Sequence, residues 1–213
     1  MPEYDTEEPD TMFRPGGTVI TQRMVSFSGL LPGSRLMDVG CGDGSTVRLL
    51  MKLGYDISGI DVAVSTDDEV HDLPVYHGTA FDLPCRDSEL DGILCECVFS
   101  LLDSPSAVIT EFKRALKPEG ALMMSDLYSH SSGGMAAGMM KNIYTREGIE
   151  RFLGSGNFSL EYFEDSSEAL KGMFAQLIFD MGANAFFKEI DMDFGDLKKL
   201  QCGYFLLVAR PLK

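Results

Sequence analysis

The amino-acid sequence predicts a doubly wound α/β fold: a mostly parallel seven-stranded sheet with helices on both faces and an antiparallel C-terminal edge strand. Three observations predict it. Short apolar segments alternate with segments of helical spacing through the first two thirds of the chain, which is typical of parallel βαβ units. A glycine-rich turn follows the first of these apolar segments. The last third contains two strand-like segments with no helix required beyond them, which favours antiparallel pairing at the edge.

The elements of the first half follow from apolar spacing and from the turn residues between them. Helical spacing over 18–31 ends at Pro32-Gly33, and the helix expected over 46–53 ends at Gly54. The apolar runs between these turn residues are too short for helices, and their composition predicts buried strands. Strands are therefore expected at 34–39, 55–60, 75–77 and 92–97.

The second half begins with a helix expected over 106–116, which the turn-forming segment 117–120 ends, and a fifth strand over 121–125. Thr145, in the segment TREG, is a capping residue and predicts the start of a helix. The remaining helices are expected at 144–153 and 166–181, and the last two strands at 158–163 and 203–210.

Composition and charge restrict the classes of function. The 213 residues suit one domain over 12–213, with a flexible acidic tail over 1–11 and a substrate-side insert or lid over 128–156. The net charge of −15 disfavours a nucleic-acid partner, because the chain would repel the phosphates. No window reaches the ~18 apolar residues of a membrane span, and no signal peptide is evident, so we expect a cytoplasmic protein. Five cysteines without regular spacing suit a reducing compartment, and no spacing of metal ligands is present.

The segment LMDVGCGDGSTVRLL, residues 36–50, carries a glycine turn between a strand and a helix. Gly40, Gly42 and Gly44 let the backbone pass close to a ligand, and the helix N-terminus can bind an anionic group. The spacing G-x-G-x-G differs from the G-x-G-x-x-G pattern of dinucleotide sites. Asp61 ends the next strand, where a carboxylate can accept hydrogen bonds from both hydroxyls of a ribose. Together these features favour an adenosyl cofactor.

Five segments in this order resemble the class I S-adenosylmethionine-dependent methyltransferases, in particular small bacterial enzymes related to the quinone-biosynthesis and arsenite methyltransferases. They are DVGCGDG (38–44), GID (59–61), HGTAFDLP (77–84), LDGILCECVFSLL (90–102) and FKRALKPEGALMMSDL (112–127). The resemblance covers residues 36–127 well and the remainder loosely. It implies a Rossmann-like methyltransferase fold and S-adenosylmethionine as the cofactor.

The resemblance also assigns the methionine end of the cofactor to four residues of the glycine turn and its strand: Asp38, Gly40, Cys41 and Gly42. It places Glu96 and Cys97 near the sulfonium. The physical chemistry agrees, because a helix N-terminus can receive the carboxylate of the cofactor, and nearby acids suit its cationic amine and sulfonium.

The adenosine half is assigned in the same way. Asp61 would hold the ribose and Val62 would lie against the adenine, and Thr79 and Ala80 would border the adenine edge. Thr79 departs from the family pattern, which usually has an aspartate that binds the adenine amino group. A hydroxyl can still accept one hydrogen bond, but without charge assistance. Asp82 is an alternative partner for that amino group, or a turn residue.

Residues on the acceptor side are expected after the fifth strand. Asp126, Tyr128 and His130 are candidates to orient an acceptor or to remove its proton. Further acceptor contacts are expected in the N-terminal segment and in the methionine-rich segment after the fifth strand. The residues predicted for these contacts are Arg14, Gly17, Met135 and Met139. The methionines can form a lid over an apolar substrate or fill a core helix.

The sequence thus predicts transfer of a methyl group to a small-molecule acceptor by in-line displacement, with no metal required. An alternative is a cofactor-binding regulatory or assembly partner without methyl transfer. Another is methylation of a thiolate-bound metalloid, because Cys95 and Cys97 are two residues apart and would share one face of a strand. Buried cysteines that act as small apolar residues are the simpler interpretation of this pair.

Overall fold

The structure is a computed structural model that describes residues 14–64, 72–131, 142–190, 195 and 201–213. The strands are β1 (Arg35–Val39), β2 (Asp56–Asp61), β3 (Val75–His77), β4 (Leu90–Glu96), β5 (Leu116–Ser129), β6 (Phe158–Asp165) and β7 (Cys202–Pro211). The helices are α1 (Gly17–Ser28), α2 (Ser45–Lys52), α3 (Pro105–Ala115), α4 (Arg146–Ser155), α5 (Ser167–Met181) and α6 (Ala183–Glu189), with a 3₁₀ turn η1 (Phe99–Leu101). The expected tail 1–11 lies outside the described residues, as does most of the methionine-rich segment.

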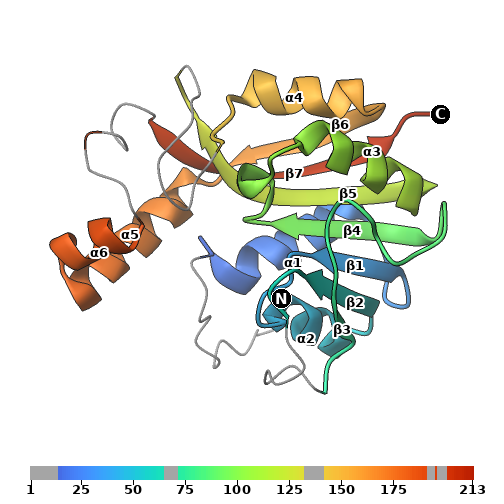
Figure 1. Cartoon of the computed structure of the whole chain (residues 1–213), viewed down its shortest axis with the longest axis horizontal. Coiled ribbons are helices and arrows are strands. Elements are labelled where there is room, and N and C mark those ends of the chain that lie inside the picture. Colours follow the sequence, from blue (N-terminus) through green and yellow to red (C-terminus); the bar gives the residue numbers. More distant parts are fainter. Residues whose placement is uncertain (1–13, 65–71, 132–141, 191–194, 196–200) are drawn as a thin grey trace.

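The strands form one seven-stranded sheet in the order β3-β2-β1-β4-β5-β7-β6 (Figure 1). Strands β1 to β5 pair in parallel, and β7 pairs antiparallel with both β5 and β6. This confirms the doubly wound fold class. One detail differs, because the C-terminal strand β7 is the penultimate strand and β6 is the edge. Nearly every residue of β7 is buried, whereas β6 is mostly half-buried or exposed. A strand as apolar as β7 is therefore placed between two others.

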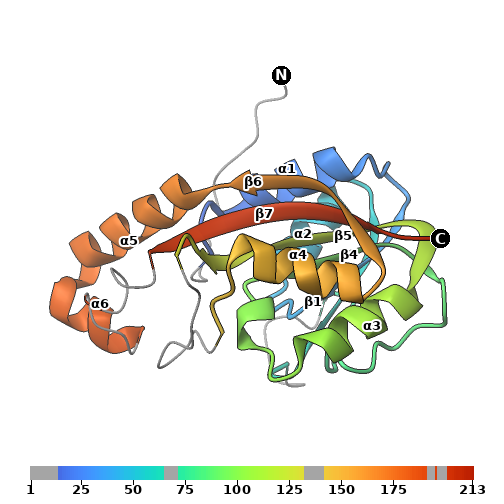
Figure 2. The ribbon, with the colours of Figure 1, turned by 90° about the horizontal axis from the view of Figure 1, so that it is seen from above.

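Helices cover both faces of the sheet (Figure 2). On one face α3 and α4 pack through Phe112 and Ile149 on the inward side chains of β4 and β5. On the other face α1, α2 and α5 contribute side chains such as Met24, Leu50 and Leu170 to a second core. The far end of α5 and the whole of α6 extend beyond the sheet (Figures 1 and 2).

Several element boundaries differ from the sequence expectation. Strand β5 is much longer than 121–125, because it pairs with β7 as far as Ser129 and takes in the expected turn 117–120 with an irregular register beside β4. Neither η1 nor α6 was expected. The cap of α4 is confirmed, since the Thr145 hydroxyl accepts a hydrogen bond from the N–H of Gly148 at 3.2 Å. In the described part of the chain, every helix is too short or too polar to cross a membrane.

Candidate functional site

The glycine turn lies at the carboxyl edge of the sheet, between β1 and α2. Gly40 has a φ of +78° and donates its N–H to the carbonyl of Ile60 at 2.8 Å, which ties the turn to β2. A Cβ on Gly40 would lie 2.2 Å from Cγ2 of Val98, the second residue after β4. The absence of a side chain therefore lets the loop after β4 rest directly on the turn. Helix α2 begins here with Gly44 as its N-cap, which has no side chain to cap the first N–H groups.

Asp61, at the end of β2, is joined to this turn. One carboxylate oxygen accepts the N–H of Gly42 at 3.0 Å, and the other accepts the N–H of Ala63 at 2.8 Å. The carboxylate is half-buried and faces the same edge as the turn. Val62 follows it with 68% of its surface exposed, so an apolar side chain is open to a flat ligand beside Asp61.

A buried polar cluster surrounds Glu96 at the end of β4. The Glu96 carboxylate is 7% exposed and accepts hydrogen bonds from the hydroxyls of Thr21 on α1 and Thr46 on α2, at 2.9 to 3.0 Å. Arg14 forms an ion pair with Glu96 at 3.4 Å and donates a short hydrogen bond to Thr46. Arg14, expected on the acceptor side, thus lies at the N-terminus of α2.

Asp38 adds a second buried carboxyl close to Glu96. Its pKa is raised well above its usual range, first by burial and then by the charge of Glu96. The Arg14 guanidinium beside Glu96 acts in the opposite direction, and Asp61 adds a smaller upward effect on the pKa of Asp38. Carboxyl groups therefore crowd at this edge, with the Arg14 guanidinium among them.

The segment after β3 is brought to Asp61 by the N–H of Gly78, which bonds to the carbonyl of Asp61 at 3.1 Å. Here Thr79 is half-buried and its hydroxyl accepts the N–H of Phe81 at 3.4 Å, while Asp82 donates its own N–H to the Thr79 carbonyl. Ala80 is buried in the core. Thr79 therefore closes its own turn and provides no charged acceptor at the position expected for the adenine edge.

This arrangement predicts that Thr79→Asp tightens binding of S-adenosylhomocysteine by about fivefold, because an anionic acceptor makes a stronger hydrogen bond than a hydroxyl. An aspartate can also keep the bond to the N–H of Phe81. The affinity is measured by calorimetry. Thr110→Asp on the exposed side of α3 adds the same charge elsewhere and is expected to leave the affinity unchanged. An unchanged or weaker affinity in Thr79→Asp would remove Thr79 from the adenine site.

Asp126, a candidate for catalysis, lies in the interior with 1% of its surface exposed. Its two carboxylate oxygens accept the N–H groups of Ser100 and Leu127, each at 2.7 Å. Burial raises its pKa from 3.8 to about 6, although these N–H groups act in the opposite direction. The arrangement gives Asp126 a structural role in fixing η1 against β5.

The raised pKa predicts a dependence of stability on pH. The folded protein binds the Asp126 proton more tightly than the unfolded chain does, so this contribution to stability is complete at low pH and is lost as the pH rises through about 6. Between about pH 4 and about pH 7 we expect the wild type to lose roughly 2 kcal/mol relative to Asp126→Asn, which stays neutral. Urea unfolding at several pH values measures the difference. Parallel stability curves for the two proteins would contradict it.

Tyr128 and His130 lie together at the end of β5. The Tyr128 ring is 4% exposed and packs edge-on against Phe163 and Phe205, and burial raises its pKa to about 12. Its hydroxyl lies 3.4 Å from Nδ1 of His130. Tyr128 is thus a neutral packing residue that orients the imidazole.

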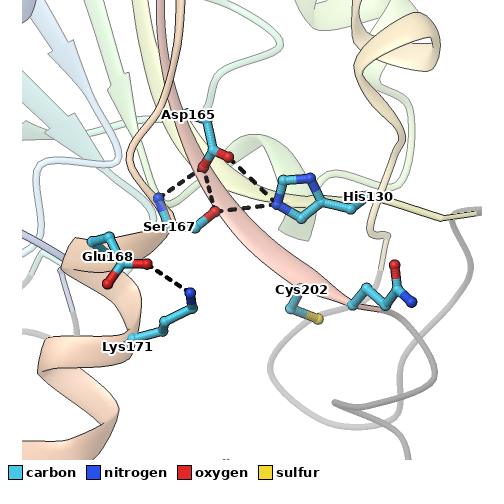
Figure 3. A pocket seen from close by; sticks show the side chains of 7 residues that line it. His130, Asp165, Ser167, Glu168, Lys171 and Cys202 are labelled. Atoms are coloured by element: carbon cyan, nitrogen blue, oxygen red, sulfur yellow. Dashed lines mark hydrogen bonds and ion pairs between the residues drawn. The ribbon is translucent and has the colours of Figure 1, made fainter.

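His130 opens onto a cavity of about 350 Å³ between β5, β7 and the start of α5 (Figure 3). The cavity is lined by His130, Asp165, Ser167, Glu168, Lys171, Gln201 and Cys202. Nε2 of His130 lies 3.3 Å from the Ser167 hydroxyl and 3.7 Å from the Asp165 carboxylate. Partial burial would raise the pKa of Asp165, but hydrogen bonds from Ser167 outweigh it and lower the pKa. The Ser167 hydroxyl donates to Asp165, so these three residues do not form a Ser-His-Asp nucleophile.

The cysteine pair does not have the expected geometry. Cys95 is fully buried in the core beneath α3, whereas Cys97 packs against the core of the opposite face. The expectation of a shared face is wrong because Cys97 has a φ of +57°, which ends the alternation of the strand. Burial raises the pKa of both thiols, which disfavours the thiolate form that a metalloid requires. Within the described ranges, no cluster of three His, Cys, Asp or Glu side chains is placed to hold a metal ion.

Comparison with known proteins agrees with this geometry. A family model described as a methyltransferase domain matches residues 37–124, from β1 into β5. The ubiquinone biosynthesis O-methyltransferase of Bordetella avium is 24% identical over 173 residues, which are 76% of this chain and 70% of that protein. Over these residues the chain is thus similar to methyltransferase domains. In two other curated relatives the matched part is 46% and 60% of the relative's length, so this chain spans about half of each.

Solved structures show the same methyltransferase fold. The geranyl diphosphate C-methyltransferase of Streptomyces coelicolor A3(2) superposes with a TM-score of 0.77 at 15% identity, covering 92% of this chain and 79% of that one. That structure contains S-adenosyl-L-homocysteine. The cyclase SpnF superposes with a TM-score of 0.70 at 24% identity over 92% of this chain and 81% of its own. A methyltransferase fold is thus also present in a protein that is named for a different reaction.

Several residues that contact the predicted site residues, directly or through one neighbour, were missed by sequence reasoning: Thr21, Thr46, Ser125, Asp165, Ser167 and Tyr204. Thr46 could have been predicted from the sequence, because it lies in the first turn of the helix after the glycine motif. The others come from α1, β5, β6, α5 and β7, and nothing in their local sequence links them to the site. Of the expected acceptor contacts, Gly17 begins α1 beside Arg14, and Met135 and Met139 lie outside the described residues.

Proposed function

We propose that this protein binds S-adenosylmethionine at the carboxyl edge of its sheet and transfers the methyl group to a small-molecule acceptor. One observation carries the proposal: the glycine turn is hydrogen-bonded to Asp61 on one side and covered by the loop after Glu96 on the other. Both halves of an adenosyl amino-acid cofactor would thus meet matching groups along one edge.

The residues present fit this cofactor. The methionine half would lie against the glycine turn, where the carboxyl groups of Asp38 and Glu96 suit its ammonium and sulfonium charges. Arg14 is held beside Glu96 and Thr46 at the N-terminus of α2, so it would face the carboxylate of the cofactor rather than the acceptor. The adenosine half would extend to Asp61 for the ribose and to Val62 for the adenine.

When bound, the cofactor would supply an electrophilic methyl group: an acceptor that attacks the methyl carbon in line breaks its bond to sulfur, and S-adenosylhomocysteine is the leaving group. The task of the chain is then to align the acceptor and to exclude water, which requires no covalent bond to the protein. The buried Glu96 cluster keeps solvent away from the donor end of the site. Its hydrogen bonds also hold this end in place. A base is needed only for an acceptor that must lose a proton first.

The cavity beside His130 is the proposed binding region for the acceptor (Figure 3). Its volume of about 350 Å³ suits a small molecule. Ser125 is the register partner of Glu96, and His130 lies five residues farther along the chain, directly after β5, or roughly 16 Å at the rise of a strand. His130 would therefore hold the distal part of an elongated acceptor and would not touch the reacting atom.

The proposed cofactor site is tested by titrating the purified chain with S-adenosylhomocysteine in a calorimeter. We expect saturable binding with one site per chain. An absence of heat together with an unchanged melting temperature at millimolar ligand would reject the cofactor site, and with it the proposed reaction.

A second candidate function is cofactor binding without methyl transfer, in a regulatory or assembly role. Thr79 provides no charged hydrogen-bond acceptor for the adenine. Weaker recognition of the adenine favours this second candidate. Binding of S-adenosylhomocysteine is common to both candidates. Only the appearance of a methylated product separates them.

A further inference from the structure

A chain of hydrogen bonds links β7 to the end of β4. The hydroxyl of Tyr204 donates to the hydroxyl of Ser125 on β5 at 3.0 Å, and the thiol of Cys97 lies 3.2 Å from the same tyrosine oxygen. Either the thiol or the hydroxyl can donate in the contact between Cys97 and Tyr204. Tyr204 has no exposed surface, so water does not compete for these bonds. Strands β4, β5 and β7 lie side by side (Figure 1).

Cys97 is in an unusual backbone conformation. Its φ of +57° lies in the left-handed region, which residues with a side chain rarely adopt outside functional sites and turns. Two bonds hold it there: its N–H donates to the carbonyl of Ser125 at 2.8 Å, and its thiol is bound to Tyr204. Residue 97 is thus fixed at both its backbone and its side chain.

The position of Cys97 determines two features of the cofactor site. It directly follows Glu96, whose carboxylate is held by Thr21 and Thr46. It directly precedes Val98, whose side chain fills the space where Gly40 lacks a Cβ. A shift of residue 97 would therefore move the acidic group and the cover of the glycine turn together.

We infer that Tyr204 is a positioning residue for the methyl-donor end of the cofactor site, acting through the thiol of Cys97. The inference rests on the proposed cofactor site and adds a residue that is more than 100 positions away from the glycine turn and the β4 loop in the sequence. Tyr204 also donates its backbone N–H to the Ser167 hydroxyl at 3.2 Å, next to His130. One residue thereby connects the donor end of the site with the proposed acceptor cavity.

Comparison of two ligands separates this role from simple support of the fold. S-adenosylmethionine carries a methyl group and a positive charge at sulfur, and S-adenosylhomocysteine lacks both. A residue that positions the donor end should affect the first ligand more than the second. A residue that only stabilises the fold should affect both equally.

The test is Tyr204→Phe, which deletes one oxygen and keeps the ring in the core. We expect S-adenosylmethionine to bind about fivefold more weakly, as for one lost hydrogen bond, with less than a twofold effect on S-adenosylhomocysteine. Tyr162→Phe is the matched control, since its hydroxyl bonds to Glu164 on the edge strand β6, and it should change neither affinity. Equal weakening of both ligands by Tyr204→Phe would overturn the inference and leave the cofactor site standing.

A double-mutant cycle tests the route through the thiol. Cys97→Ala keeps the Cβ and deletes the sulfur, and we expect it to weaken S-adenosylmethionine binding as much as Tyr204→Phe does. The double variant should be no weaker than either single one. If the double variant weakens binding by the product of the two single effects, Tyr204 acts by a path that does not include the thiol. If Tyr204→Phe does not fold, Cys97→Ala alone decides, because equal affinities for the two ligands relative to wild type would contradict the inference. A wild type that binds neither ligand would reject both this inference and the proposed function.

Discussion

Asp61→Ala is expected to weaken the binding of S-adenosylhomocysteine by about 100-fold, which corresponds to two lost hydrogen bonds between a carboxylate and the ribose hydroxyls. The structure adds a second reason. Asp61 accepts the N–H of Gly42, so its loss also removes one of the hydrogen bonds that hold the glycine turn to β2. Calorimetry measures the affinity, and circular dichroism confirms that the variant is folded.

Asp56→Ala is the matched control for this prediction. Asp56 is the same residue type at the opposite end of β2, and its side chain is 72% exposed. Its side chain forms a long ion pair with Arg35, which contributes little in solvent. We expect wild-type affinity in this variant. Equal affinities of Asp61→Ala and Asp56→Ala would remove Asp61 from the ribose site.

Gly40→Ala is expected to destabilise the fold by roughly 3 kcal/mol or more and to abolish cofactor binding. The new methyl group would lie 2.2 Å from Cγ2 of Val98, and the backbone is in the left-handed region. Val98 would have to move, and the loop that carries Glu96 would move with it. Urea unfolding measures the loss of stability.

Gly33→Ala separates the cost of the left-handed backbone from the cost of the close contact with Val98. Gly33 has a φ of +89°, but a Cβ there would meet nothing within 4 Å. This variant therefore carries only the cost of the left-handed backbone, about 1 kcal/mol, and should bind the cofactor normally. If Gly40→Ala is as stable as Gly33→Ala and still binds, the close contact between Val98 and the glycine turn has no functional importance.

The sequence was sufficient for the elements of the fold because their signals are local. Apolar spacing, the glycine turn and the capping Thr145 each depend on a few neighbouring residues, and the structure has each expected element within a few residues of its predicted bounds except β5. The order of the last strands in the sheet has no local signal in the sequence. Placing β7 between β5 and β6 depends on how completely each strand can be buried, and the short apolar run of β5 gave no sign that it continues to Ser129.

The site was predictable where its residues belong to one motif. The glycine turn and Asp61 are joined in the structure as their strand-end positions suggested. The contacts of Glu96 with Arg14 and Thr21 join residues 82 and 75 positions apart, and the contact of Tyr204 with Cys97 spans 107 positions. A single sequence contains no information on such pairs. The face of Cys97 was mispredicted for a different reason, since a positive φ in a residue other than glycine has no sequence signature.

We propose that this chain transfers a methyl group from S-adenosylmethionine to a small molecule. The most direct measurement incubates the purified chain and a metabolite extract with S-adenosylmethionine labelled in its methyl group, and separates the products by size. We predict label in a new small molecule, absent without protein and strongly reduced with Asp61→Ala. Label on macromolecules would contradict the small-molecule acceptor. Bound cofactor with no labelled product from repeated extracts would contradict methyl transfer itself.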